Sequence, residues 1–187
     1  MSGVPELAEL VEGFAPETDE ETALASDPEL CAGLAWGQPR PGHPEGAVGA
    51  HVSDLLRTID EDGETGERRR LMRFITLVHD SFKYRVQDWR PRTGSNHHAA
   101  RARRFAEGYT DDERILATVE LHDRPYQLWK KMKKKGSLDE DAFEEMMDQV
   151  PDPDLFLRFI ELDGSTEGKN PEPIEWFRDE LRRRGYL

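Results

Sequence analysis

From Val48 onward, apolar residues recur at the spacing that places them on one face of an α-helix. The first stripe runs through Val52 and Leu55 to Ile59 in steps of three or four residues. Later stripes predict helices over residues 67–80, 97–107, 113–132 with an interruption near Pro125, 140–147, 155–163 and 174–181. No stretch alternates between apolar and polar residues for long enough to predict a strand. The pattern therefore predicts an all-α fold.

The first part of the chain, residues 1–42, is acidic and interrupted by prolines. It contains two candidate short helices, Pro5–Glu12 and Glu20–Leu34, before glycines and prolines stop the pattern. We expect residues 1–42 to form an arm packed on the main body. We expect residues 43–187 to form one helical domain that includes the C-terminal helices.

Short polar motifs predict where several of these helices begin. The sequences T-D-D-E, starting at Thr110, and S-L-D-E, starting at Ser137, match the capping box of a helix N-terminus. Ser95 or Asn96 is the predicted cap of the helix over 97–107. These motifs place Thr110 and Ser137 at the N-cap positions of their helices.

Composition limits the class of protein. At 187 residues the chain is long enough for one domain with a substantial core. A charged fraction of 35% and a hydrophobic fraction of 36% suit a helix-rich protein with solvated outer faces. The net charge of −13 argues against a partner as long and anionic as nucleic acid. This charge does not exclude a small phosphorylated substrate that binds through a metal ion.

Three further features predict a cytoplasmic protein. The single cysteine, Cys31, cannot form an internal disulfide, which suits a reducing compartment. The N-terminal region is acidic where a signal peptide carries basic residues. No apolar run approaches the length of a membrane span, so we expect no membrane partner. The sequence makes no prediction of oligomeric state.

Histidines and aspartates carry the candidate chemistry. The chain has six histidines, at His43, His51, His79, His97, His98 and His122. His51 stands one turn from Val48 and Leu55, and His79 follows Ile75 by four residues, so both point inward. Burying a polar group is costly unless a partner satisfies it. Imidazole and carboxylate ligands on successive helices predict a pocket for a divalent transition metal (Mn, Fe, Co, Ni or Zn) inside a helical bundle.

Two motifs resemble a known family. The stretch H-P-E-G-A-V-G-A-H, residues 43–51, and the stretch H-D-S-F-K, residues 79–83, are similar to the opening motifs of the HD-domain superfamily. The first is especially similar to the HD domain of bacterial tRNA nucleotidyltransferases. The resemblance covers residues 43–165 and implies an HD-domain helical bundle with a metal site in its core. The nucleotidyltransferase half of those enzymes is absent, so that activity is not expected.

The resemblance also implies a ligand set of one or two metal ions. It assigns His51, His79, Asp80 and Asp163 to one ion, and His97 and His122 to a second ion with Asp80 as the bridge. Asp163 follows Phe159 by four residues on the same helix face. Asp123 is the alternative to Asp163, but on a continuous helix it would face about 100° away from His122.

The roles of the remaining histidines and of Lys83 are less directly implied. The resemblance favours His97 over His98, because Ala102 then falls where the family keeps a small residue, and His98 is expected to be an outer neighbour. His43 is expected to have a structural or outer role. Lys83 would contact a substrate phosphate or the metal-bound water. Phe82 stands where the family often has glycine, which puts that placement of the lysine in question.

The leading functional hypothesis is a metal-dependent phosphohydrolase acting on a small phosphate ester or nucleotide, with Asp80 and Lys83 as catalytic residues. Arg101 would add positive charge, and the loop carrying Trp89, Arg90 and Arg92 would close as a lid. One alternative is an HD-type di-iron oxygenase that cleaves a carbon bond with O₂, since the ligand pattern is shared. Another is a non-catalytic HD domain that binds a metal or a nucleotide.

Overall fold

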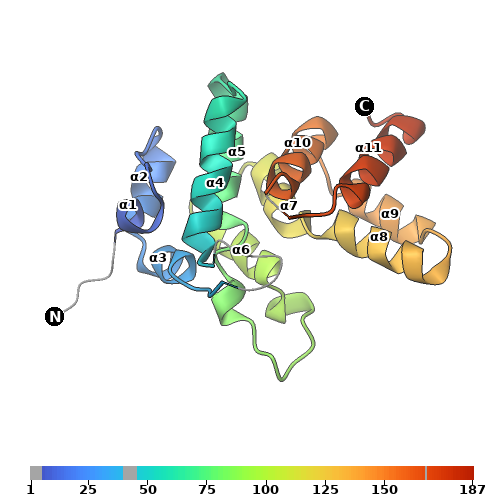
Figure 1. The fold of residues 1–187 in the computed structure, drawn as a ribbon, viewed down its shortest axis with the longest axis horizontal. Coiled ribbons are helices and arrows are strands. Elements are labelled where there is room, and N and C mark those ends of the chain that lie inside the picture. The colour runs from blue at the N-terminus through green and yellow to red at the C-terminus, as the bar shows by residue number, and fades with distance from the viewer. Residues whose placement is uncertain (1–5, 40–45, 167) are drawn as a thin grey trace.

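The computed structural model describes residues 6–39, 46–166 and 168–187. Every regular element in these ranges is helical, which confirms the all-α prediction (Figure 1). The helices are α1 (Leu7–Leu10), α2 (Asp19–Ala25), α3 (Pro28–Leu34), α4 (Val48–Glu61), α5 (Gly66–Val78), α6 (His98–Ala106), α7 (Glu113–Leu121), α8 (Arg124–Lys135), α9 (Glu140–Met147), α10 (Pro153–Gly164) and α11 (Glu172–Arg184). Two 3₁₀ turns, η1 (Lys83–Arg85) and η2 (Gly94–Asn96), connect α5 to α6.

The helices α4 and α5 pack on each other near the middle of the molecule, and α7 and α10 pack against them (Figure 1). The N-terminal helices α1, α2 and α3 lie at one end, and α8, α9 and α11 lie at the other. The predicted interruption near Pro125 is confirmed, because α7 ends before it and α8 begins with it in the first turn. No helix in the described ranges combines the length and the apolar content that crossing a bilayer requires.

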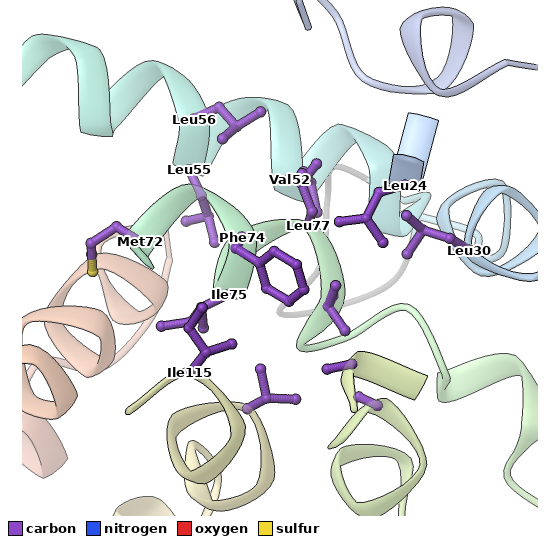
Figure 2. Close-up of a cluster of buried hydrophobic side chains, with 14 of the residues drawn as sticks. Leu24, Leu30, Val52, Leu55, Leu56, Met72, Phe74, Ile75, Leu77 and Ile115 are labelled. Carbon is purple, nitrogen blue, oxygen red and sulfur yellow. The ribbon is translucent and has the colours of Figure 1, made fainter. Parts of the chain in front are cut away.

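The predicted apolar stripes form two buried clusters. The first lies among α1–α7 and α10 and includes Leu24, Phe74 and Ile115 (Figure 2). The second lies among α7–α11 and includes Phe143 and Phe177. Since α7 and α10 contribute to both clusters, residues between these two helices lie where the two cores meet.

The helices of residues 6–39 contribute directly to the first cluster, where Leu7, Leu24 and Leu30 are fully buried. A buried ion pair joins them to α5. Nε and one Nη of Arg73 each donate a hydrogen bond of 2.8 Å to the Glu21 carboxylate. Both side chains are almost completely buried. Two parallel hydrogen bonds of this kind fix the relative position of the two helices.

The predicted helix over residues 20–34 is two helices, α2 and α3. Asp27 separates them because its carboxylate accepts hydrogen bonds from the backbone N–H groups of Glu29 and Leu30. Pro28 then occupies the first turn of α3, where its missing N–H is not needed. Residues typical of a helix start therefore end one helix and begin the next.

The two predicted capping boxes are displaced by two residues. Asp112, not Thr110, is the N-cap of α7, and Asp139, not Ser137, is the N-cap of α9. In both helices the aspartate carboxylate accepts a backbone N–H, and its negative charge suits the positive end of the helix dipole. The Thr110 hydroxyl instead accepts from the N–H of Asp112, in the turn before the helix.

Gly33 permits an unusually close approach between α3 and the end of α5. A Cβ atom at this position would lie 1.7 Å from the backbone oxygen of Ser81. Any larger residue would therefore force α3 away from the turn that follows α5. Ser81 is itself held there, because its hydroxyl donates to the backbone oxygen of Leu77.

We predict that Arg73→Met lowers the free energy of unfolding by about 3–5 kcal/mol, because it leaves the buried Glu21 carboxylate without its main partner. The measurement is urea denaturation followed by circular dichroism. The matched control is Arg57→Met, since Arg57 is mostly exposed and pairs with the nearby Asp54. That variant should change stability by less than about 1 kcal/mol. Equal effects of the two substitutions would contradict the structural role of this ion pair.

Candidate metal centre

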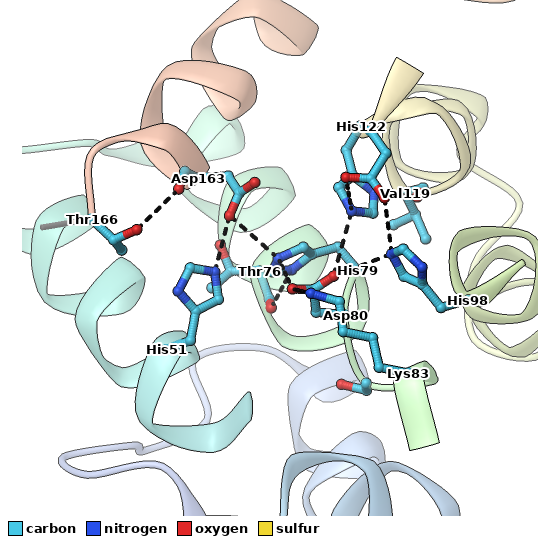
Figure 3. Close-up of polar contacts among 12 residues, drawn as sticks. His51, Thr76, His79, Asp80, Lys83, His98, Val119, His122, Asp163 and Thr166 are labelled. Atoms are coloured by element: carbon cyan, nitrogen blue, oxygen red, sulfur yellow. Dashed lines mark hydrogen bonds and ion pairs between the residues drawn. The ribbon is translucent and has the colours of Figure 1, made fainter. Parts of the chain in front are cut away.

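Five of the residues predicted to bind metal come together between α4, α5, α7 and α10 (Figure 3). They are His51, His79, Asp80, His122 and Asp163. His51 lies within α4 and Asp163 within α10. The other three stand at helix ends, since His79 is the C-cap of α5, Asp80 follows it, and His122 is the C-cap of α7.

The first group of donor atoms surrounds a point between α4, α5 and α10. Nε2 of His51 lies 2.9 Å from Oδ1 of Asp163, and Nε2 of His79 lies 3.8 Å from the same oxygen. Nε2 of His79 also lies 3.5 Å from Oδ2 of Asp80. Ligands about 2.0–2.2 Å from one ion are about 3–4 Å from each other. His51, His79 and Asp80 could therefore hold a metal ion, and Asp163 lies beside them.

A second group lies on the other side of Asp80. Its Oδ1 atom is 3.3 Å from Nε2 of His98 and 3.5 Å from Nε2 of His122. The three residues also form a group that could hold a metal ion. Asp80 thus directs Oδ2 toward the first group and Oδ1 toward the second, which is the geometry of a bridging carboxylate.

Backbone hydrogen bonds fix the orientation of two imidazoles. Nδ1 of His79 lies 3.0 Å from the backbone oxygen of Thr76, and Nδ1 of His122 lies 2.8 Å from that of Val119. Since a carbonyl oxygen only accepts, Nδ1 carries a proton in both rings, and Nε2 is the nitrogen that each ring directs at the centre. The buried ring of Phe159 packs edge-on against both imidazoles.

Three buried polar atoms at the centre have no hydrogen-bond partner among the described residues. They are Nε2 of His79, Oδ1 of Asp80 and Nε2 of His98. A buried polar atom without a partner costs about 1–3 kcal/mol. Two imidazole nitrogens and a carboxylate oxygen directed at one region are the donors that a transition metal takes. The residues present therefore fit a bound divalent cation.

The local electrostatics favour a cation at this place. Burial lowers the pKa of His79 to about 4, so its imidazole is neutral near pH 7. Burial would also lower the pKa of His122, but the carboxylates of Asp123 and Asp80 outweigh it and raise that pKa to about 9. A metal ion would be attracted by the same carboxylates and would take the place of the proton on His122.

The two carboxylates of the centre remain ionised. Burial alone would raise the pKa of Asp80, but Lys83 and the surrounding imidazoles hold it well below its usual range. Lys169 and His51 do the same for the pKa of Asp163. Both aspartates are therefore available as anionic ligands near neutral pH.

The structure brings His98, not His97, to Asp80. His97 is the N-cap of α6, and its Nδ1 accepts a hydrogen bond from the N–H of Ala99. Its extended backbone turns its side chain back onto the first turn of the helix. His97 lies instead in an outer group with His98 and Asp123. The prediction that Ser95 or Asn96 caps this helix was wrong, because both residues belong to η2 and His97 is the cap.

Asp123 lies closer to the centre than the sequence indicated. Its Oδ2 is 3.3 Å from Nε2 of His98, and its Oδ1 is 3.8 Å from Nε2 of His122. The predicted separation of about 100° assumed one continuous helix. Because α7 ends at Leu121 and Asp123 precedes α8, the two side chains can approach the same region. The interruption signalled by Pro125 was the clue to this arrangement.

A cavity of about 400 Å³ opens on the centre, and two lysines line it. Nζ of Lys83 pairs with Oδ2 of Asp80 at 2.5 Å, so the side chain reaches the site despite Phe82 before it. Phe82 packs away from the cavity against Phe105. Nζ of Lys169 donates to the backbone oxygen of Asp163 at 2.6 Å and to its carboxylate at 3.2 Å. Sequence reasoning missed Lys169, which follows α10 where no helical period applies.

The remaining candidates lie elsewhere. Trp89 is 79% exposed and, like Arg90, Arg92 and Arg101, is not part of the cavity lining. The loop that carries Trp89 is held by the buried Asn96, whose amide bonds to the backbone of Gln87 and Pro91. The structure does not bring these residues to the cavity, and closure of this loop over a substrate stays a prediction. His43 lies outside the described residues.

Comparisons with models of protein families, with curated proteins and with solved structures gave no match. The all-helical fold and its buried cluster of histidines and aspartates are compatible with an HD domain.

We predict that Asp80→Ala removes most bound metal, because Asp80 belongs to both groups of donor atoms. The measurement is Mn²⁺ and Zn²⁺ content after dialysis, with circular dichroism to check the helix content. Asp88→Ala is the matched control, since Asp88 is exposed and pairs with Arg92. An Asp80 variant with the metal content of the unchanged protein would contradict the assignment.

We predict different effects for the adjacent histidines. His98→Ala should weaken metal binding by at least about tenfold, because it removes a donor directed at Asp80. His97→Ala should keep the metal and lose about 1 kcal/mol of stability, the usual effect of removing an N-cap. Isothermal titration with Mn²⁺ and thermal denaturation separate the two. The reverse pattern would restore His97 as the ligand.

Proposed function

We propose that this protein is a metal-dependent phosphohydrolase acting on a small phosphate ester. The observation that carries the proposal is that two lysine ammonium groups and the histidine–aspartate donors open on one cavity. Metal ligands alone suit many reactions. Metal ligands beside Lys83 and Lys169 suit a substrate with several negative oxygens.

The charges of the site support an anionic substrate only after metal binding. With the histidines neutral, as metal ligands are, the carboxylates of Asp80, Asp123 and Asp163 exceed the ammonium groups of Lys83 and Lys169 by one negative charge before the charge of the metal is added. One divalent cation would reverse this to one positive charge, and a second would add two more. A phosphate monoester would then be attracted rather than repelled.

The donor groups suit one or two divalent ions. One ion would be held by His51, His79, Asp80 and Asp163, and a second by Asp80, His98 and His122. Such an ion supplies an activated water and neutralises charge on the phosphoryl oxygens. The buried ring of Phe159 behind the imidazoles keeps bulk water from that side.

The lysines have distinct roles in this proposal. Lys83 is held by Asp80 and would donate a hydrogen bond to a phosphoryl oxygen on which charge develops. Burial would lower its pKa, but Asp80 outweighs burial and raises it, so the ammonium stays charged. Lys169 is held by Asp163 on α10 and would contact another phosphoryl oxygen.

The chain as a whole favours a small substrate over a polymer. Its net charge of −13 repels a polyanion in proportion to the length that approaches the surface. A single phosphate group is instead neutralised locally by metal ions and two lysines. The proposal therefore excludes long nucleic acid as the preferred substrate.

We predict hydrolysis of small phosphate esters in a screen with Mn²⁺, Co²⁺, Ni²⁺ and Mg²⁺. Lys83→Ala should lower the turnover number on the order of 10²-fold, the usual effect of removing one charge-stabilising donor. Metal content should not change, because a lysine ammonium is not a ligand. Lys134→Ala is the matched control, since this residue is exposed on α8 and does not line the cavity.

Two results would contradict the proposal. One is the absence of hydrolysis of any phosphate ester with any of these metals. The other is consumption of substrate that depends on O₂, measured with the iron-loaded protein. That result would favour the oxygenase alternative.

A further inference from the structure

The lining of the cavity beside the metal centre has two chemically different parts. The charged part consists of the groups already described, from Asp80 and Lys83 to Lys169. The second part, which we call the uncharged end, consists of Pro125, Tyr126, Ile160, Gly164, Gly168, Asn170, Pro173 and Ile174. None of these eight residues carries a charge, so they offer no ion pair to a second anionic group.

Tyr126 is the most unusual residue of the uncharged end. It is 52% exposed, although an aromatic ring of this size normally buries most of its surface. Among the large hydrophobic residues found exposed in the described ranges, it alone lines the cavity. One side is supported by Trp129, whose ring is stacked on it with centroids 6.0 Å apart. The ring is thus held in place while part of it remains open to the cavity.

Another part of the lining is fixed by close packing between α10 and α11. A Cβ atom at Gly164 would lie 2.0 Å from Cδ1 of Ile174, so glycine is needed for Ile174 to lie this near α10. Ile160, one turn before Gly164, continues the same wall. An apolar wall and a supported aromatic ring thus line the same cavity as the charged residues.

We propose that this end of the cavity binds the leaving group of the substrate, and that this group is flat, apolar and uncharged, with Tyr126 stacking on it. The inference rests on the proposed function, since it assumes that the other end holds the phosphate. It specifies the substrate as a phosphate monoester of an aromatic or similarly flat alcohol. Tyr126 then determines specificity and takes no part in the chemical step.

The test compares two phosphonates that cannot be hydrolysed, so that binding is measured apart from turnover. Isothermal titration of the Mn²⁺-loaded protein should show phenylphosphonate binding at least about tenfold more tightly than methylphosphonate. Tyr126→Ala should weaken the binding of phenylphosphonate by about three- to tenfold and leave methylphosphonate unchanged. Tyr126→Phe should retain both affinities, because stacking needs only the ring.

Kinetics provide the second measurement. Tyr126→Ala should raise KM for phenyl phosphate and leave KM for glycerol phosphate unchanged, with little effect on kcat for either ester. Trp89→Ala is the matched control, because Trp89 is an exposed aromatic residue outside the cavity lining. It should alter neither the affinities nor the kinetic constants.

The outcomes separate this inference from the proposed function. Equal affinity for the two phosphonates, or equal weakening of both by Tyr126→Ala, would overturn the inference while hydrolysis of phosphate esters still stands. Failure to bind either phosphonate, together with failure to hydrolyse any ester, would overturn the proposed function and this inference with it.

Discussion

The Asp80 carboxylate is buried among imidazoles and one ammonium group, with an oxygen directed at each of two groups of donors. A buried charge is stable only where opposite charge and hydrogen-bond donors surround it. Here Lys83 supplies part of that compensation and leaves Oδ1 without a hydrogen bond. His79, Lys83, His98 and His122 approach this one carboxylate from the end of α5, from η1, from α6 and from the end of α7. Polar side chains are thereby gathered at the boundary between two apolar cores.

The part of the site that could be predicted from the sequence lies within regular helices or directly beside them. His51, His79 and Asp163 follow apolar stripes, and the helical period fixes the direction of a side chain on such a stripe. The same reasoning predicted the all-α fold and the interruption near Pro125. This reasoning works because burial of one helix face fixes which residues are apolar, and they recur with the helical period.

The errors lie at helix ends and in connections. Whether His97 or His98 faces Asp80 depends on which of them caps α6, and adjacent residues at a helix start point in unrelated directions. Asp123 approaches His122 because α7 ends at Leu121, before either residue. Lys169 reaches Asp163 from a segment without periodicity, so only the folded chain shows the contact. At such positions, local hydrogen bonds decide the geometry and the hydrophobic pattern carries no information.

The contact between Gly33 and the Ser81 carbonyl has a consequence for the modularity of the chain. Ser81 directly follows Asp80, so α3 packs behind the turn that carries this candidate ligand. A fragment that began at α4 would expose one side of the first core and leave this turn unsupported. We therefore expect that dividing the protein near residue 42, at the boundary suggested by composition, would destabilise the first core. Fusion or exchange of segments would have to keep residues 6–39 together with the helices that hold the centre.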